Sequence, residues 1–206
     1  MNHKTQALWD KQDQHKGDRW RLFQAVGAAV PARKVLYAGS YVDVAPSFVY
    51  DDVTYVDIDK RAAAFFADTL GVSEIIADHG GSANARVAFI HSDYGSLALE
   101  EAGFDLLISL YAGFISEACG HLLRIGGVLL VNASHGDAAL AALDPRFQLW
   151  AVVTTSGGQY RVSDQALERY MVPKKPQVIT AESVKAAGRA IAYTKTPFAY
   201  LFKRIC

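Results

Sequence analysis

The sequence has few cysteines and no long apolar run. Only Cys119 and Cys206 occur among its 206 residues, and no spacing of Cys and His typical of a metal site is present. This excludes a disulfide framework and predicts no bound metal. No apolar run approaches the roughly 20 residues of a membrane span, and the first residues lack the apolar core of a signal peptide. We therefore expect a cytoplasmic protein that does not bind a membrane.

An excess of charge of either sign is also missing. Lys and Arg together number 21, and Asp and Glu together number 21, so the formal net charge is zero. A protein that binds nucleic acid mainly by releasing counterions usually carries a basic excess. The balance of charge therefore disfavours nucleic acid as the partner.

Short apolar segments alternate with helical or loop segments along the chain. Five of them span residues 34–38, 53–56, 86–90, 104–109 and 128–131. Continuous apolar strands are typical of a parallel sheet that is buried on both faces. The sequence therefore predicts an α/β protein with a doubly wound, mostly parallel Rossmann-like sheet flanked by helices. Two further strands at 147–154 and 198–204 give about seven strands in all.

Helical periodicity and end signals predict the helices. We expect them over residues 20–30, 60–67, 115–124, 138–143, 163–170 and 181–188. Residues 4–14 are expected to form either a short helix or an ordered arm. Asp59 immediately precedes the helix over 60–67 and is the expected N-cap. Gly126-Gly127 is expected to close the helix over 115–124.

The chain is predicted to be a single domain, 1–206, with four parts. Residues 1–31 form N-terminal helices, 34–154 form the core, 157–196 form an insert, and 198–204 close the sheet. The insert separates two strands that should pair, and a segment this long is usually functional. We expect it to form a lid over the carboxyl ends of the strands. The alternatives are cover for the sheet edge or an oligomer contact.

Polar motifs follow three of the predicted strands. Gly39-Ser40-Tyr41 follows the first, Asp57-Ile58 the second, and Asp93-Tyr94 the third. The distance from Gly39 to Asp57 is near the ~20 residues expected for dinucleotide-binding folds. With the apolar fourth strand and the Gly-Gly turn before the fifth, this order resembles the class I S-adenosylmethionine-dependent methyltransferase fold. The resemblance covers residues 34–154 and, more loosely, 198–204, where the last strand would be antiparallel.

The resemblance implies that the cofactor is S-adenosylmethionine. Asp57 would accept hydrogen bonds from both ribose hydroxyls, and Ile58 is assigned to the same part of the site. Asp93 would accept a hydrogen bond from the adenine amino group, and Tyr94 would stack on the adenine or pack beneath it. Ser109, at the end of the fourth strand, would lie near the methionine portion.

The glycine loop departs from the pattern of the family. The family has glycines at three alternate positions of this loop. Here only Gly39 is a glycine, and Tyr41 and Asp43 occupy the other two positions. Glycines there let the backbone approach the amino-acid end of the cofactor. Gly39, Ser40 and Tyr41 would therefore form a cofactor loop with a different path, or one that holds the cofactor less closely.

Simpler structural roles compete with these assignments. Asp57 and Asp59 would both be helix caps, and Asp93 would form an Asx turn before Gly95. Gly39 would be a plain strand-to-helix turn. We assign capping to Asp59 and ribose binding to Asp57.

Methyl transfer from a sulfonium mainly requires positioning and desolvation, because the donor is already activated. Candidate side chains lie at the carboxyl ends of strands four and five, and they are Tyr111, Asn132, Ser134, His135 and Asp137. Histidine is suited to proton transfer near neutral pH, so His135 would act as a base and Asp137 would orient it. Alternatively, Ser134 or Asp137 caps the helix over 138–143 and His135 is merely exposed.

Three functions therefore compete. The first is an S-adenosylmethionine-dependent methyltransferase that acts on a small-molecule acceptor, with a homo-oligomer left open. The second is a non-catalytic member of the same fold, which the broken glycine pattern favours. The third is a nicotinamide-dependent oxidoreductase, which would need a glycine at the position of Tyr41.

Overall fold

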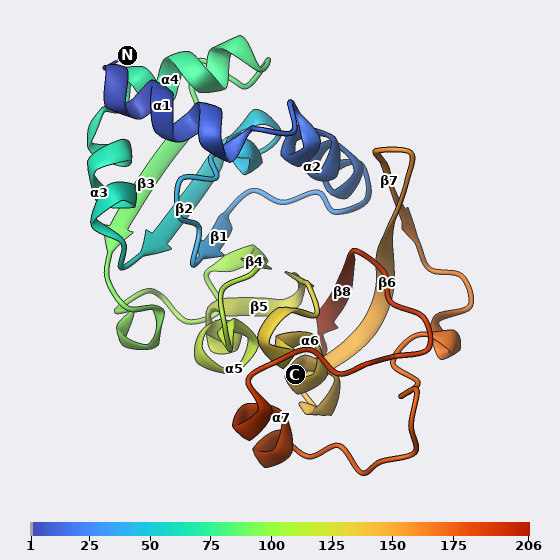
Figure 1. The fold of residues 1–206 in the computed structure, drawn as a ribbon. Coiled ribbons are helices and arrows are strands. Elements are labelled where there is room, and N and C mark those ends of the chain that lie inside the picture. Colours follow the sequence, from blue (N-terminus) through green and yellow to red (C-terminus); the bar gives the residue numbers. More distant parts are fainter. Residues whose placement is uncertain (1) are drawn as a thin grey trace.

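The computed structural model describes residues 2–206 and builds one eight-stranded sheet, with the order β3-β2-β1-β4-β5-β8-β6-β7 (Figure 1). The strands are β1 (Val35–Ala38), β2 (Asp52–Asp57), β3 (Arg86–His91), β4 (Phe104–Ser109), β5 (Leu123–Val131), β6 (Phe147–Ser156), β7 (Gln159–Ser163) and β8 (Ala199–Arg204). Strands β1 to β5 pair in parallel, and β8 is antiparallel to both β5 and β6. The predicted Rossmann-like sheet with an antiparallel last strand is confirmed.

Helices cover both faces of the sheet. They are α1 (His3–Gln12), α2 (Asp18–Ala29), α3 (Lys60–Ala67), α4 (Thr69–Asp78), α5 (Ile115–Cys119), α6 (Asp137–Leu143) and α7 (Ala181–Ala187). Short 3-10 turns are η1 (Ala45–Phe48), η2 (Tyr94–Ser96), η3 (Gly120–Leu122), η4 (Ser134–Gly136) and η5 (Leu167–Arg169). The turn η1 takes the place of the usual first crossover helix.

The apolar strands explain why two layers of helices form. Successive side chains of a strand point to opposite faces. In β1, Val35 and Tyr37 pack in the core cluster that includes α2, α3 and α4, whereas Leu36 and Ala38 pack in the cluster that includes α5 and α6. All four side chains are buried, as the continuous apolar run predicts.

The last third of the chain differs from the prediction. Residues 159–163 form an eighth strand paired with β6 across a Gly157-Gly158 turn, so the expected helix over 163–170 is wrong apart from the short turn η5. Both glycines have positive φ, which a tight hairpin requires. The predicted insert therefore begins as the edge strand of the sheet.

A second correction concerns the approach to β5. The helix expected over 115–124 ends early, as α5 and η3, and Gly126-Gly127 lie inside β5 instead of closing a helix. Pairing with β4 shifts register between Phe104 and Leu106, opposite this glycine pair. The pair therefore lets the strand bulge before it enters the core.

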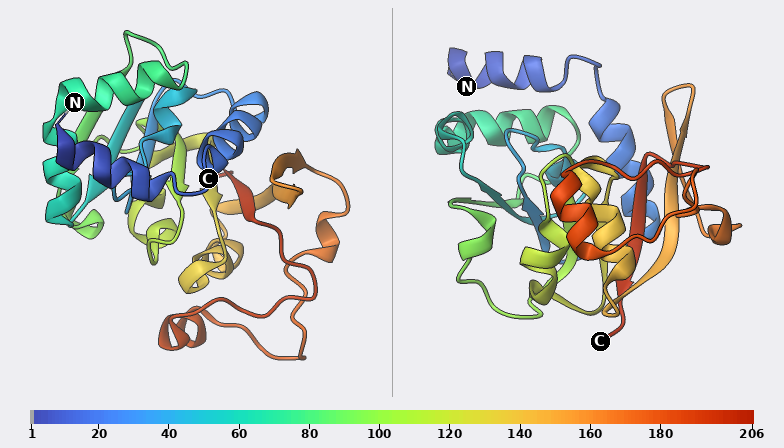
Figure 2. Two further views of the ribbon diagram at one scale, coloured as in Figure 1. Left: turned by 45° about the horizontal axis from the view of Figure 1, so that its top comes forward. Right: turned by 60° about the horizontal axis from the view of Figure 1, so that its bottom comes forward.

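Helices α1 and α7 pack at different ends of the molecule (Figures 1 and 2). Helix α1 lies against α3 and α4, whereas α7 lies against α6 and η4. Val184 of α7 is fully buried against Leu140 and Tyr193. No helix within residues 2–206 has the length and apolarity needed to cross a membrane.

Candidate active site

Two backbone hydrogen bonds hold the loop after β1 against the end of β2. The Gly39 and Ser40 N–H groups both donate to the Val56 carbonyl, at 2.8 and 3.2 Å. Gly39 has a φ of +69°, and a Cβ there would lie 2.2 Å from the Cβ of Ala112 in the loop after β4. This position therefore requires glycine, because the β1 and β4 loops touch there.

Asp57 is held by the backbone on both sides. Its Oδ2 accepts the Tyr41 N–H at 2.7 Å, and its Oδ1 accepts the Asp59 N–H at 2.8 Å. The side chain is half-buried, and the next residue, Ile58, is 64% exposed. The carboxylate is thus oriented by the protein while each oxygen retains acceptor capacity.

Asp59 caps α3, as expected. Its carboxylate accepts the Arg61 N–H at 2.7 Å and forms an ion pair with the Arg61 guanidinium at 2.6 Å. These side-chain and backbone hydrogen bonds lower the pKa of Asp59 to about 2. The guanidinium of Arg61 also lies over the Tyr41 ring, 5.2 Å from its centroid. Asp57 and Asp59 therefore have different surroundings, although they are two residues apart.

Asp93 follows β3 and forms the turn that was the alternative to ligand binding. Its Oδ1 accepts the Gly95 N–H at 2.7 Å, which starts η2. The side chain is nevertheless exposed, so the turn does not prevent it from contacting a ligand. Tyr94 is half-buried and packs against the core cluster beneath α5. The ligand roles of both residues stay predictions.

The expected pairing of His135 with Asp137 is wrong. Asp137 is 1% exposed, and its carboxylate accepts the Ser109 hydroxyl at 2.6 Å and the Ser116 N–H and hydroxyl. Burial raises its pKa, although the hydrogen bonds from Ser109 and Ser116 oppose that shift. The carboxylate points inward, where it accepts hydrogen bonds from Ser116 in the first turn of α5 and from Ser109 at the end of β4. Asp137 is therefore a structural link, and the Ser109 hydroxyl is committed to it.

Two other polar candidates do face solvent. His135 is exposed, and its Nδ1 lies 2.7 Å from the Ser134 hydroxyl. Tyr111 is 55% exposed, and its N–H donates to Asn132 Oδ1 at 3.3 Å. The N-cap of α6 is Gly136, so the alternative role, in which Ser134 or Asp137 caps this helix, is also wrong.

Unusual backbone conformations gather at the same edge. Among residues 2–206, seven residues other than glycine have positive φ, and three of them are Tyr41, Tyr111 and His135. They follow β1, β4 and β5. Such conformations cost free energy and tend to cluster at functional sites, so this observation independently points to the carboxyl edge of the sheet.

A buried ion pair, which the sequence did not indicate, lies at the same edge of the sheet. Asp43, in the loop after β1, is 1% exposed, and its Oδ2 lies 3.3 Å from Arg19 Nε of α2. The Tyr37 hydroxyl donates to the same oxygen at 3.1 Å. The Arg19 guanidinium also lies over the Tyr111 ring, 5.4 Å from its centroid. Burial by itself would lower the pKa of Arg19, but Asp43 together with Tyr37, Tyr111 and Tyr160 holds that pKa above its ordinary value.

Arg19 had no local signal in the sequence. It precedes Asp43 along the chain and lies in a different element, so only the packing of α2 on the β1 loop brings the two together. Within residues 2–206, no cluster of three or more His, Cys, Asp or Glu side chains could hold a metal ion.

Solved structures share this architecture. The chain aligns with a candidate O-methyltransferase from Klebsiella pneumoniae at 12% identity, covering 79% of this chain and 88% of that chain, with a TM-score of 0.52. It aligns over 100% of its length with 99% of a chain in the complex of the Haloferax volcanii Trm112 methyltransferase activator with a candidate methyltransferase, at 12% identity and a TM-score of 0.51. The match to YjhP from E. coli covers 57% of this chain but only 48% of that chain, at 19% identity and a TM-score of 0.42.

No protein-family model matches the sequence, and no curated protein matches it. The structural likeness and the strand order define the fold as that of the class I S-adenosylmethionine-dependent methyltransferases. The resemblance in fold that the sequence motifs indicated is confirmed.

Proposed function

We propose that the protein is an S-adenosylmethionine-dependent methyltransferase that acts on a small-molecule acceptor. The observation that carries the proposal is the carboxylate of Asp57 at the end of β2. The Tyr41 and Asp59 N–H groups fix its two oxygens, and the side chain still reaches the surface. A carboxylate held in this way suits a pair of ribose hydroxyls, because it accepts both hydrogen bonds without having to reorient.

The residues fit the adenosine half of this cofactor better than its methionine half. Ile58 offers exposed apolar surface next to Asp57, and Asp93 offers an exposed carboxylate at the neighbouring strand end. On the other half, Tyr41 and Asp43 replace glycines, and Asp43 is enclosed. That half of the loop therefore carries side chains at positions where the family usually has glycine.

Bound S-adenosylmethionine would supply a methyl group on a positively charged sulfur, which is activated for in-line displacement. The residues of this chain then have to position the acceptor and exclude water. Tyr111 and His135 are the exposed polar side chains at the ends of β4 and β5, and their backbones are held in the left-handed region. We assign them to the acceptor side, with His135 as the base for an acceptor that must lose a proton.

Thermal unfolding with a ligand panel tests the proposal. S-adenosylmethionine or S-adenosylhomocysteine should raise the melting temperature and NAD should not, since a ligand at 100 times its Kd stabilises the folded state by about 2.7 kcal/mol. Asp57→Asn is the matched variant, because it keeps the size of the side chain and removes the charge. A clear shift with NAD, and none with either sulfur compound at millimolar concentration, would overturn the assignment.

A second candidate function is cofactor binding without turnover. It is favoured by Tyr41 and Asp43 in the glycine places and by the burial of Asp137, which removes a partner for His135. Binding of S-adenosylhomocysteine with no methylated product across a broad acceptor panel would support this candidate. A single methylated product would exclude it.

A further inference from the structure

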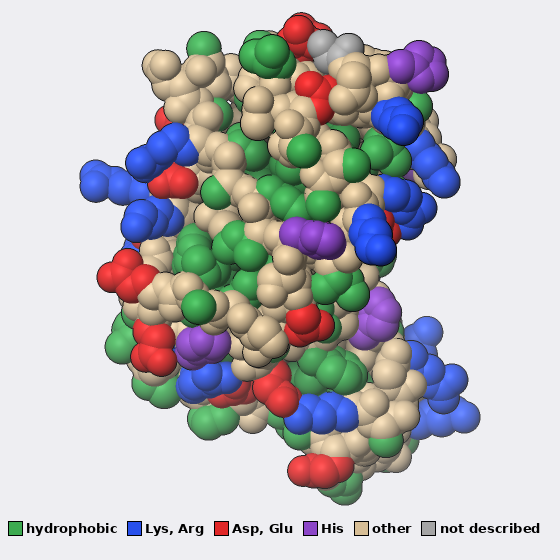
Figure 3. All heavy atoms as spheres, turned by 90° about the vertical axis from the view of Figure 1, so that its left-hand side faces the viewer, with side chains coloured by type: hydrophobic (Ala, Val, Ile, Leu, Met, Phe, Trp, Pro, Cys, Tyr) green, Lys and Arg blue, Asp and Glu red, His purple; other side chains and the backbone are tan. Residues whose placement is uncertain are grey.

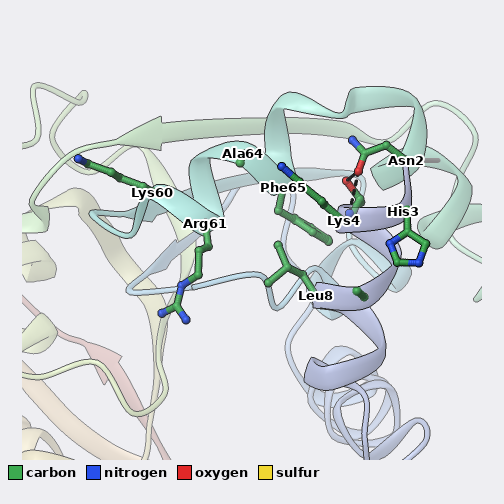
Figure 4. Close-up of a pocket in the computed structure, with 10 residues that line it drawn as sticks. Asn2, His3, Lys4, Leu8, Lys60, Arg61, Ala64 and Phe65 are labelled. Carbon is green, nitrogen blue, oxygen red and sulfur yellow. Dashed lines mark hydrogen bonds between the residues drawn. The ribbon is translucent and has the colours of Figure 1, made fainter.

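A groove lies between α1 and α3, outside the strand-end residues described above (Figure 4). Its volume is about 790 Å³, within the range of roughly 300–1,000 Å³ that is usual for small-molecule sites. Leu8 of α1 and Ala64 and Phe65 of α3 form apolar parts of its wall. Ala64 is exposed and Leu8 is half-buried, so these two side chains offer apolar surface to a ligand, whereas Phe65 is fully buried.

Cations surround this apolar wall. His3 and Lys4 come from the first turn of α1, and Lys60 and Arg61 come from the first turn of α3, whereas no Asp or Glu lines the groove. In Figure 4 the side chain of Lys4 extends over Phe65 toward α3. Figure 3 shows Lys and Arg side chains gathered along the right-hand edge of this side of the molecule, below a His.

Helix stability does not explain these cations. The positive end of a helix dipole disfavours Lys and Arg in the first turn, and neither α1 nor α3 has an acidic residue there. Arg61 is neutralised by Asp59, but within residues 2–206 neither Lys4 nor Lys60 forms an ion pair. Lys4 thus brings an uncompensated ammonium group to the groove, whereas in Figure 4 the side chain of Lys60 points away from Leu8 and Phe65.

We propose that this groove binds an amphiphilic carboxylate, with its hydrocarbon chain along Leu8 and Ala64 and its carboxylate at Lys4. The volume suits a small molecule, the wall suits an alkyl chain, and the cations are complementary to an anionic head. The groove lies apart from the residues proposed for methyl transfer, so the test of this site does not depend on the proposed function.

Calorimetric titration with straight-chain carboxylates tests the site. The full chain is used with any tag at the carboxyl end, because residues 2–8 contribute to the groove. Across hexanoate, octanoate and decanoate, affinity should rise about two- to fourfold per methylene as each one is buried. Decanol and decyltrimethylammonium should bind about tenfold or more weakly than decanoate, because they lack the negative charge that Lys4 recognises.

Two variants separate the head from the chain. Lys4→Glu should weaken decanoate binding about tenfold or more, and this variant should fold, since Glu is favourable in the first turn of a helix. Ala64→Trp should block the alkyl chain while it leaves the cations in place. Lys175→Glu, exposed and outside the groove, is the charge-matched control. Decyltrimethylammonium binding as tightly as decanoate, or decanoate binding that neither variant weakens, would overturn the proposal.

Discussion

Four of the aspartates along the carboxyl edge of the sheet divide into two pairs. Asp57 and Asp93 are accessible and accept hydrogen bonds from backbone N–H groups near the ends of β2 and β3. Asp43 and Asp137 are enclosed, and side chains from other elements donate to them. Similar positions in the sequence therefore produce two kinds of carboxylate.

The difference shows how the edge is divided between structure and ligand. A buried carboxylate must have its hydrogen bonds satisfied inside the protein, so it is committed to its partners. Asp43 joins the β1 loop to Arg19 of α2, and Asp137 joins β4 to α5 through Ser109 and Ser116. The buried pair holds the loops in place, and the accessible pair is left for a ligand.

The largest effect should come from breaking the buried ion pair. Arg19→Ala leaves the Asp43 carboxylate enclosed without its cation, which should lower the free energy of unfolding by about 3–5 kcal/mol. Urea unfolding at neutral pH measures the loss. The double variant Arg19→Met with Asp43→Asn removes both charges and should recover part of the stability. A loss below about 1 kcal/mol for Arg19→Ala would show that the pair is not needed to hold the loop.

Removing the second buried carboxylate should cost slightly less. Asp137→Ala leaves the hydroxyls of Ser109 and Ser116 without their acceptor, at an expected cost of about 3 kcal/mol. Asp137→Asn keeps one acceptor oxygen and should cost less than Asp137→Ala. If Asp137→Ala instead abolished methyl transfer at unchanged stability, the residue would return to the catalytic role predicted from the sequence.

The accessible pair should affect ligand binding more than folding. Asp57→Ala should weaken S-adenosylhomocysteine about 10- to 150-fold, equivalent to about 1.5–3 kcal/mol for charge-assisted hydrogen bonds. Its two backbone hydrogen bonds predict a smaller loss of folding stability. Asp51→Ala, an exposed acid just before β2 at the opposite end of that strand, is the control. Equal affinities for the two variants would leave Asp57 with a structural role only.

The sequence predicted the sheet well because buried parallel strands appear in the sequence as continuous apolar runs. The apolar runs at β1, β2 and β4 were recognised nearly to their ends. Strand β7 was missed because Gln159–Ser163 is an edge strand with polar residues, and its identity depends on pairing with β6. Edge strands need little burial, so they lack the apolar run by which the other strands were found.

The candidate site was predicted only where local geometry decides it. Asp59 could be recognised as a cap because an N-cap is defined by the residues that follow it. The burial of Asp137 depends on where α5 meets α6, and the pairing of Asp43 depends on α2. Contacts of this kind join residues far apart in the chain, so no spacing in the sequence could show that these acids are enclosed.

The smallest effect should come from Asp59, which is accessible but acts on structure. Asp59→Ala removes the N-cap of α3 and should cost about 1 kcal/mol, whereas Asp59→Asn keeps a capping oxygen and should cost only the exposed ion pair with Arg61, about 0.5 kcal/mol or less. The hydrogen bonds from Arg61 lower the folded-state pKa to about 2 from the ordinary value of 3.8. A lowered pKa means that the charged form stabilises the fold fully above pH ~4 and that this contribution is lost as the pH falls toward 2. Urea unfolding of wild type and Asp59→Asn from pH 7 to pH 3 should therefore show a small difference in stability that shrinks only below pH ~4. A difference that grows as the pH falls would contradict the assignment, because protonation would then be strengthening the contact that the charge is proposed to make.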